Sequence, residues 1–443
     1  MKYLFKVILL FLIAFNFIVP VVHYSATVAV LIAGIYYLFV KKSVPFTYFF
    51  SRYSFIIFVG SILMVLFDLL AVTLHGNVGI GFLLRYIVQG WMLICLVFVL
   101  PILMDNEETA FNDAMTVICG AFALQGLVHT LAFLMPSFGE FILNFQSANP
   151  ERIRAATMDI NHFRFYALTG APFFDLPSAY GVACIIFFRL QLIPGQNYLR
   201  GWKAFTVMVF MILGIMLSGR TGFIGLGLGL AFYLIYKWND LAQMWRNILK
   251  ITFGFLCLLA IFYAVLTPSQ RGNLINNVFP FAFEAYYNWR DYGRFSTGSS
   301  DMLMQVHYFP LEPKTLMWGD GGVTSANQDY IHTDAGYMNH IMIGGIPYLL
   351  LAIIYQWLYF WQPMKMARRE QSKNGNINFF CFFLLFAHMF ILEYKGAAFG
   401  FIHIVEVLLL YIGISYLAEQ YALEEPVKEK ASSEKLSNES VFA

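Results

Sequence analysis

Long apolar runs separated by short polar stretches dominate this chain of 443 residues. Hydrophobic residues make up 59% of it and charged residues only 12%, which leaves too little polar surface to cover a water-soluble domain. The runs approach the ~20 residues that a helix needs to cross a bilayer, and they lack the short alternating pattern of a membrane barrel. The sequence therefore predicts an all-α, polytopic membrane protein.

About twelve transmembrane helices are expected. They cover residues 4–22, 24–40, 53–74, 79–100, 113–135, 178–193, 203–218, 222–237, 250–267, 340–361, 378–393 and 398–418. Residues 1–423 then form a single transmembrane domain, and residues 424–443 form a polar tail without regular structure. Two loops are much longer than the others, at 136–177 and 268–339.

The basic residues set the orientation of these helices. Most of them fall in alternate loops, which the positive-inside rule places in the cytoplasm. They include Lys41, Lys42, Arg52, Arg200, Lys203, Lys237, Arg246, Lys250, Lys365, Arg368, Arg369 and Lys373. Both termini are then cytoplasmic and both long loops lie outside. Only the acidic stretch 105–113 departs from this pattern, and acidic residues weigh little in the rule.

The basic residues expected outside differ in type from those inside. Eight arginines and two lysines lie outside by this topology, whereas the others are six arginines and twelve lysines. Because the planar guanidinium binds phosphate or carboxylate through two hydrogen bonds, the bias predicts an anionic ligand outside. The alternative is that these arginines brace the loops by pairing with Asp159, Asp291 or Asp301.

Ionisable residues also lie within the outer halves of the expected spans. Asp68 and Arg85 are each about 12 Å below the outer surface at 1.5 Å rise per residue, where they are placed to pair with each other. The others are His129, His388, Glu393, Lys395, His403 and Glu406. Such groups are costly unless they face a partner or water, so they predict a polar cavity open to the outside.

The sequence Ser-Gly-Arg-Thr-Gly at 218–222 ends one span and begins the next with almost no loop. Backbone N–H groups at the helix start, Arg220 and the hydroxyls of Ser218 and Thr221 would together bind an anion. An arginine that reaches lipid phosphate is an equal alternative. The glycines that follow are typical of close helix packing in a membrane.

Two further motifs lie near the end of the second long loop. They are Trp-Gly-Asp-Gly-Gly at 318–322 and Thr-Asp-Ala-Gly-Tyr at 333–337, which runs into Gly-Gly-Ile at 344–346. With the motif at 218–222, they make residues 150–410 resemble the Wzy-type O-antigen or capsular polysaccharide polymerases. The chain departs from that family because neither long loop has the arginine with a glycine eleven positions later that recurs in some polymerases.

The resemblance implies a glycosyltransferase in the bacterial inner membrane. Such an enzyme joins undecaprenyl diphosphate-linked oligosaccharide repeats at the periplasmic face and releases the lipid diphosphate. The family also implies a chain-length regulator protein as a partner. No nucleic-acid footprint is present, and no cofactor is expected.

Particular residues are candidates for this chemistry. Arg220, Arg290 and Arg294 are expected to hold the diphosphate, with Arg152 and Arg154 as further candidates. Arginines can stabilise a leaving diphosphate in place of a metal, and neither a carboxylate cluster nor a cysteine pattern predicts a metal site.

Acid–base chemistry on the acceptor hydroxyl needs a separate group. His332 and Asp334 are the candidates, since they lie where the long loop returns to the membrane. In the alternative, Asp334 caps the following helix.

Two other functions share these features. An O-antigen ligase carries out the same chemistry on a different acceptor. A lipid-linked oligosaccharide flippase or transporter also fits twelve spans with both ends inside, although transporters carry their sites at the midplane and usually have internal repeats. Aromatic residues in the second long loop either stack on sugars or rest on the bilayer surface.

Overall fold

The computed structural model describes residues 2–41, 48, 51–75, 81–146, 168–170, 174–193, 199–240, 249, 260, 263–321, 333–370 and 372–441. Nearly all of this is helical, apart from one small antiparallel ribbon of β1 (Ile18–Val19) and β2 (His23–Tyr24). The predicted all-α class is confirmed.

Eleven helices correspond in position to predicted spans. They are α1 (Lys2–Phe15), α2 (Ser25–Tyr36) extended by η1 (Tyr37–Lys41), α3 (Arg52–His75), α4 (Gly81–Leu103), α5 (Ala110–Leu134), α8 (Asp175–Leu192), α9 (Trp202–Ser218), α10 (Gly222–Lys237), α17 (Gly336–Arg369), α18 (Lys373–Lys395) and α19 (His403–Val441). The predicted span 250–267 lies almost wholly outside the described residues.

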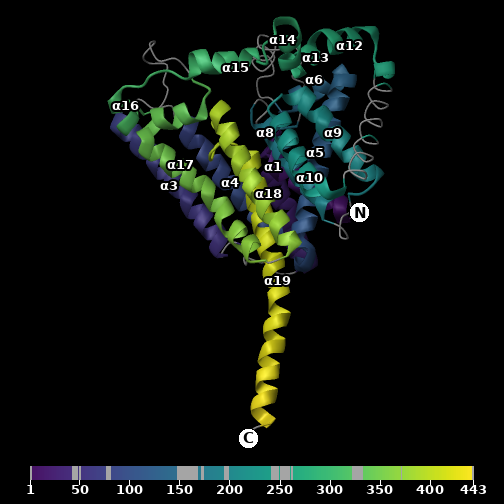
Figure 1. The fold of residues 1–443 in the computed structure, drawn as a ribbon, viewed down its shortest axis with the longest axis vertical. Coiled ribbons are helices and arrows are strands. Elements are labelled where there is room, and N and C mark those ends of the chain that lie inside the picture. Colours follow the sequence, from purple (N-terminus) through teal and green to yellow (C-terminus); the bar gives the residue numbers. More distant parts are fainter. Residues whose placement is uncertain are drawn as a thin grey trace.

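Shorter helices connect or cover this bundle. They are η2 (Glu107–Thr109), α6 (Pro136–Gln146), η3 (Trp238–Asp240), α12 (Pro268–Asn273), η4 (Leu274–Val278), α13 (Phe279–Ala282), α14 (Glu284–Tyr292), α15 (Gly298–Met302), η5 (Leu303–His307) and α16 (Pro313–Trp318). We call the segment from α12 to α16 the outer cover. The outer cover extends across one end of the bundle (Figure 1).

Six helical segments in the described part of the chain are long and apolar enough to cross a membrane. They are Arg52–His75, Leu84–Leu103, Glu107–Leu134, Gly336–Arg369, Lys373–Lys395 and His403–Leu423. The chain is therefore a helical membrane protein. The predicted number of twelve spans goes beyond these six helices and stays a prediction.

Glycines bring α8 and α10 together, as their spacing predicts. A Cβ atom added at Gly181 would lie 3.3 Å from the Cα of Gly225, and one added at Gly229 would lie 3.1 Å from the carbonyl oxygen of Cys184. A Cβ atom added at Gly225 would overlap the Gly181 carbonyl oxygen, which leaves no room for a side chain there. This contact fixes the start of α10 against α8 and so fixes the position of Arg220.

The acidic stretch between α4 and α5 has a local explanation. Asp105 forms ion pairs with Lys2 and Lys6 of α1. Partial burial alone would raise the pKa of Asp105, but hydrogen bonds from both lysines lower it. The negative charge thus offsets basic residues at the same end of the bundle, which is why it departs from the loop pattern.

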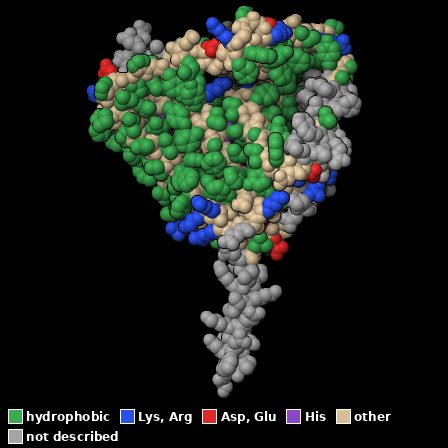
Figure 2. Space-filling model, viewed as in Figure 1, with side chains coloured by type: hydrophobic (Ala, Val, Ile, Leu, Met, Phe, Trp, Pro, Cys, Tyr) green, Lys and Arg blue, Asp and Glu red, His purple; other side chains and the backbone are tan. Residues whose placement is uncertain are grey.

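The two ends of the molecule differ in character. The outer cover and α6, which come from the two long loops, lie at the end opposite to the C-terminus (Figure 1). Basic side chains gather at the other end (Figure 2), where Arg52, Lys365 and Arg369 line a cavity of about 140 Å³. Both loops therefore share one end of the bundle, and predicted cytoplasmic residues share the other.

The C-terminal segment differs from its prediction. The polar tail 424–443 was expected without regular structure, but α19 continues through it to Val441 and projects from the bundle (Figure 1). Its sequence is rich in glutamate and lysine, which are strong helix formers. Local propensity therefore extends the helix beyond the apolar span.

Candidate functional site

Arg220 lies at the short junction between α9 and α10, as the sequence predicts. Its guanidinium forms an ion pair with Glu284, the first residue of α14, and stands 4.5 Å from the ring centre of Phe281. Its Nη2 atom donates a hydrogen bond of 3.4 Å to Ser299 Oγ in α15. The side chain is 17% exposed, so the outer cover closes over it without removing it from water.

A second cation lies beside this junction. Lys395, the last residue of α18, donates from Nζ to Thr221 Oγ1 at 3.4 Å. Thr221 and Ser218 are both buried. Lys395 and Arg220 thus put two positive charges next to the start of α10. We call Ser218, Arg220, Thr221 and Lys395 the cationic junction.

Arg290 and Arg294 lie elsewhere, on the outer cover. Arg290 donates to both carboxylate oxygens of Asp291, at 2.6 and 3.0 Å, and lies 4.9 Å from the ring centre of Tyr287. The hydrogen bond from Arg290 lowers the pKa of Asp291. Arg294 is exposed. Within the described residues, no hydrogen bond joins either arginine to the cationic junction, and Arg290 has the bracing partner that the alternative expected.

Asp334 is exposed just before α17, beside His307 of the outer cover. Its backbone N–H donates to His307 Nδ1 at 3.0 Å, and its Oδ2 atom lies 3.7 Å from His307 Nε2. Thr333 Oγ1 donates to the carbonyl of His307 at 2.8 Å. The residue before α17 is Ala335, with no side-chain cap. The capping alternative for Asp334 is therefore wrong, and a histidine that sequence reasoning missed is its neighbour.

The remaining predicted site residues, His332, Arg152 and Arg154, lie outside the described residues. Within the ranges that the structure describes, no group of three or more histidine, cysteine, aspartate or glutamate side chains is arranged to hold a metal ion.

A buried pair lies below Asp334. His340 Nε2 of α17 is 3.1 Å from Glu393 Oε1 of α18, and both side chains are 0% exposed. Glu393 Oε2 accepts hydrogen bonds of 2.7 Å from the backbone N–H groups of Ala398 and Phe399. A Cβ atom at Gly336 would lie 2.6 Å from the Glu393 carbonyl oxygen. Glu393 therefore joins the start of α17 to the turn between α18 and α19.

Asp68 has a different partner from the one predicted. Its Oδ1 atom accepts a hydrogen bond of 2.6 Å from the hydroxyl of Tyr348, which lies 3.5 Å from the hydroxyl of Tyr86. Arg85 is exposed and stands 5.5 Å from the ring centre of Phe401. The predicted Asp68–Arg85 pair is wrong, because Tyr348 of α17 reaches the buried carboxylate while Arg85 lies on an exposed part of α4.

Several ionisable residues of the bundle are thus buried, although Arg85 and Lys395 of the predicted set are not. His340, Glu393, His388 and Glu406 are all fully buried. The predicted polar cavity open to the outside is not found at these residues, because side chains from several helices pack around them. We refer to Asp68, Tyr348, His340 and Glu393 as the buried polar layer.

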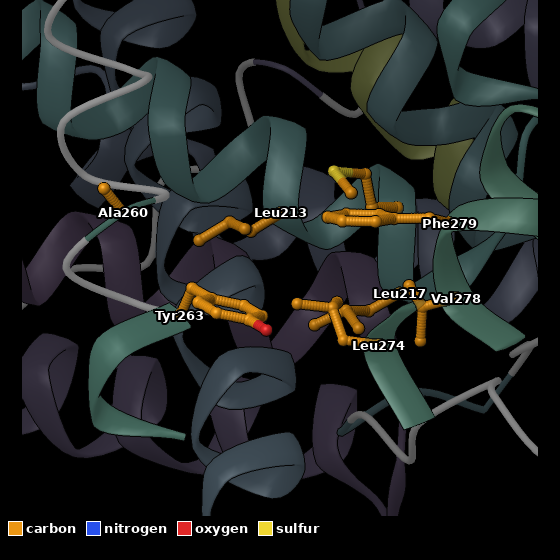
Figure 3. A pocket seen from close by; sticks show the side chains of 8 residues that line it. Leu213, Leu217, Ala260, Tyr263, Leu274, Val278 and Phe279 are labelled. Atoms are coloured by element: carbon orange, nitrogen blue, oxygen red, sulfur yellow. The ribbon is translucent and has the colours of Figure 1, made fainter. Parts of the chain in front are cut away.

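An apolar cavity lies next to the cationic junction. It has a volume of about 250 Å³, and Figure 3 shows side chains from α9, η4, α13 and the segment before α12 around it. Its lining consists of Leu213, Met216, Leu217, Ala260, Tyr263, Leu274, Val278 and Phe279. Leu217 directly precedes Ser218, and Phe279 lies two residues before Phe281, which Arg220 contacts, so the apolar space lies beside the Arg220 side of the junction. The arrangement suits a ligand with a hydrocarbon chain and an anionic head.

Comparisons with known proteins identify no family: no family model matches the chain, and no curated protein or solved structure matches it.

Proposed function

We propose that this protein is a membrane glycosyltransferase that polymerises lipid-linked oligosaccharide repeats. Its substrate is an undecaprenyl diphosphate-linked repeat unit, and it acts at the periplasmic face of the bacterial inner membrane. The observation that carries the proposal is the cationic junction beside an apolar cavity, under the outer cover. A hydrocarbon chain fits the cavity, and a diphosphate fits Arg220 and Lys395.

The reaction needs charge stabilisation on one side and proton transfer on the other. The bond between the anomeric carbon and the diphosphate breaks, and Arg220 and Lys395 stabilise the negative charge that develops on the leaving group. The acceptor hydroxyl forms the new bond to that carbon and loses its proton. Asp334, exposed beside His307, is the group that takes it.

The competing functions make different use of the same features. An O-antigen ligase would transfer the finished chain to a lipid A-core acceptor with the same residues. A flippase would need a path through the bundle, whereas Glu393 and His340 are sealed in the buried polar layer and the outer cover lies at one end. The glycan transferase is therefore favoured over the transporter.

The glycans of a deletion strain test the proposal. A polymerase predicts single repeats on the acceptor, a ligase predicts unattached polymer, and a flippase predicts repeats stranded inside. Purified protein given a lipid-linked repeat should also polymerise it in the presence of a chelator. Loss of activity that magnesium or manganese restores would overturn the arginine mechanism.

Orientation is tested separately. Reporters at Ser299 and Asn149 should lie outside, and those at Gln243 and Ser372 inside, with both termini cytoplasmic. An inside signal at Ser299 would place the cationic junction on the wrong face and end the proposal.

A further inference from the structure

Glu284 holds together the elements that cover Arg220. One carboxylate oxygen pairs with the Arg220 guanidinium. The other, Oε1, accepts a hydrogen bond of 2.8 Å from the backbone N–H of Gly298, at the start of α15. The carboxylate therefore has two donors, and Ser299 Oγ accepts a hydrogen bond from the same arginine.

These donors are of the kind that bind a phosphate oxygen. A guanidinium, a backbone N–H and a hydroxyl can each donate to a carboxylate or to a phosphate. A carboxylate carries less charge and fewer acceptor oxygens than a diphosphate, so the diphosphate makes more of these bonds. Lys395, at the other side of the junction through Thr221, adds a second positive charge.

We infer that the Glu284 carboxylate occupies the position of a substrate phosphate and that the diphosphate displaces it on binding. This inference rests on the proposed function, because it assigns the lipid diphosphate to Arg220. Displacement also breaks the Glu284–Gly298 hydrogen bond, which links α14 to α15. Binding of the anionic head therefore releases the part of the outer cover that lies over Arg220.

Displacement of Glu284 by the diphosphate predicts the opposite result from a purely structural role of Glu284 in holding Arg220. If Glu284 competes with the ligand, Glu284→Gln removes the competing charge and the site binds a diphosphate more tightly. If Glu284 only holds Arg220 in place, the same variant binds it less tightly. The glutamine keeps the size of the side chain and its hydrogen-bonding oxygen, so the outer cover stays folded.

The test uses full-length protein in phosphatidylcholine nanodiscs, with farnesyl diphosphate as the probe. Glu284→Gln should bind it about tenfold more tightly than the wild type, which corresponds to the loss of one charge-assisted contact. Glu312→Gln is the matched control, because Glu312 is exposed on the same outer cover and its removal changes only the overall charge. It should bind as the wild type does.

A second readout follows the cover itself. Trp289 lies on α14, five positions after Glu284, and is exposed. Farnesyl diphosphate should change its fluorescence in the wild type, because binding breaks the Glu284–Gly298 hydrogen bond, and Trp289→Phe identifies the signal. Equal or weaker probe binding by Glu284→Gln would overturn the inference.

Two further comparisons show whether the bound phosphate belongs to a lipid diphosphate or to a membrane lipid. A separate outcome distinguishes failure of this inference from failure of the proposed function. Inorganic pyrophosphate should bind more weakly than farnesyl diphosphate, because it leaves the apolar cavity empty, and phosphatidylglycerol nanodiscs should not abolish the difference between variants. If they do, a lipid phosphate is the ligand and the inference fails. Failure of the wild type to polymerise lipid-linked repeats would instead overturn the proposed function, whatever the binding result.

Discussion

The buried polar layer and the outer cover hold their charged side chains in different ways. In the layer, Glu393 is 0% exposed, and its partners are His340 on another helix and two backbone N–H groups. On the cover, Arg290 is 54% exposed and pairs with the next residue, Asp291. Arg220, 17% exposed, lies between these extremes. The contribution of each charged side chain to stability should therefore depend on how deeply it is buried and on whether its partner lies on another helix or next to it in the sequence. Residue type alone should not decide it.

The largest expected effect is on Glu393. Glu393→Ala leaves two buried N–H groups without their acceptor and removes the carboxylate beside His340, and breaking such a buried pair costs about 3 kcal/mol. The variant should unfold at a clearly lower temperature in detergent and accumulate less in the membrane. Glu393→Gln keeps an oxygen for the two N–H groups and should lose only about 1 kcal/mol. Equal losses in both variants would mean that the charge, not the hydrogen bonds, holds the turn.

Asp334 should show a large effect on activity with almost none on stability. Its side chain is 84% exposed, so Asp334→Asn leaves the fold intact, but it cannot accept a proton from the acceptor hydroxyl. Polymer formation should fall at least about 100-fold, leaving single-repeat glycan at normal protein levels. His332→Ala is expected to behave in the same way. Long polymer from both variants would redirect the search to His307, which contacts Asp334.

Arg220→Lys tests the charged side chain whose exposure is intermediate between those of Glu393 and Arg290. Lysine keeps the charge but loses the fork that can bind a diphosphate through two hydrogen bonds. We expect the rate of polymerisation to fall about 30-fold, equivalent to about 2 kcal/mol of lost stabilisation, with an unchanged unfolding temperature. Wild-type chain lengths would show that a positive charge alone suffices there, and would exclude Arg220 as a diphosphate clamp.

The sequence predicted Arg220 because its signal is local: a glycine-flanked arginine between two apolar runs. Its partners carry no such signal. Glu284 is 64 positions away, Lys395 lies 174 positions from Thr221, and His307 lies 27 positions from Asp334. Only the packing of α10, α14 and α18 brings them together. Pairing Asp68 with Arg85 failed for the same reason, since depth in the membrane predicts burial but not which helix supplies the partner.

The fold, like the candidate site, could be predicted in part. Apolar runs gave the positions of the described bundle helices, because burial in lipid demands helices with internally satisfied backbones. The short helices of the outer cover were not predicted. Their polar and aromatic residues have no long apolar run, and local caps set their boundaries, such as the reciprocal hydrogen bonds of Thr267 and Gln270 at the start of α12.

A smaller effect is expected at the opposite end, where Asp105 pairs with Lys2 and Lys6. Because the folded pKa of Asp105 is lowered, this stabilisation is present above the unfolded pKa of about 3.9 and is lost as the pH falls through the folded value. Asp105→Asn should cost about 1 kcal/mol at pH 7. The gap between wild type and variant in unfolding temperature should narrow when the pH is lowered toward 3.

The smallest effect is expected for Arg290, which the sequence ranked beside Arg220. Arg290 pairs with its neighbour Asp291 in water, and exposed pairs of this kind contribute little to stability. Arg290→Lys should polymerise within about twofold of the wild type and unfold at the same temperature. A loss as large as that of Arg220→Lys would mean that the outer cover carries Arg290 to the diphosphate during the reaction. The two arginines would then form one site. In that case, pairing with a sequence neighbour, as in Arg290, would not distinguish a residue without a catalytic role from one, such as Arg220, whose partner is distant in the sequence.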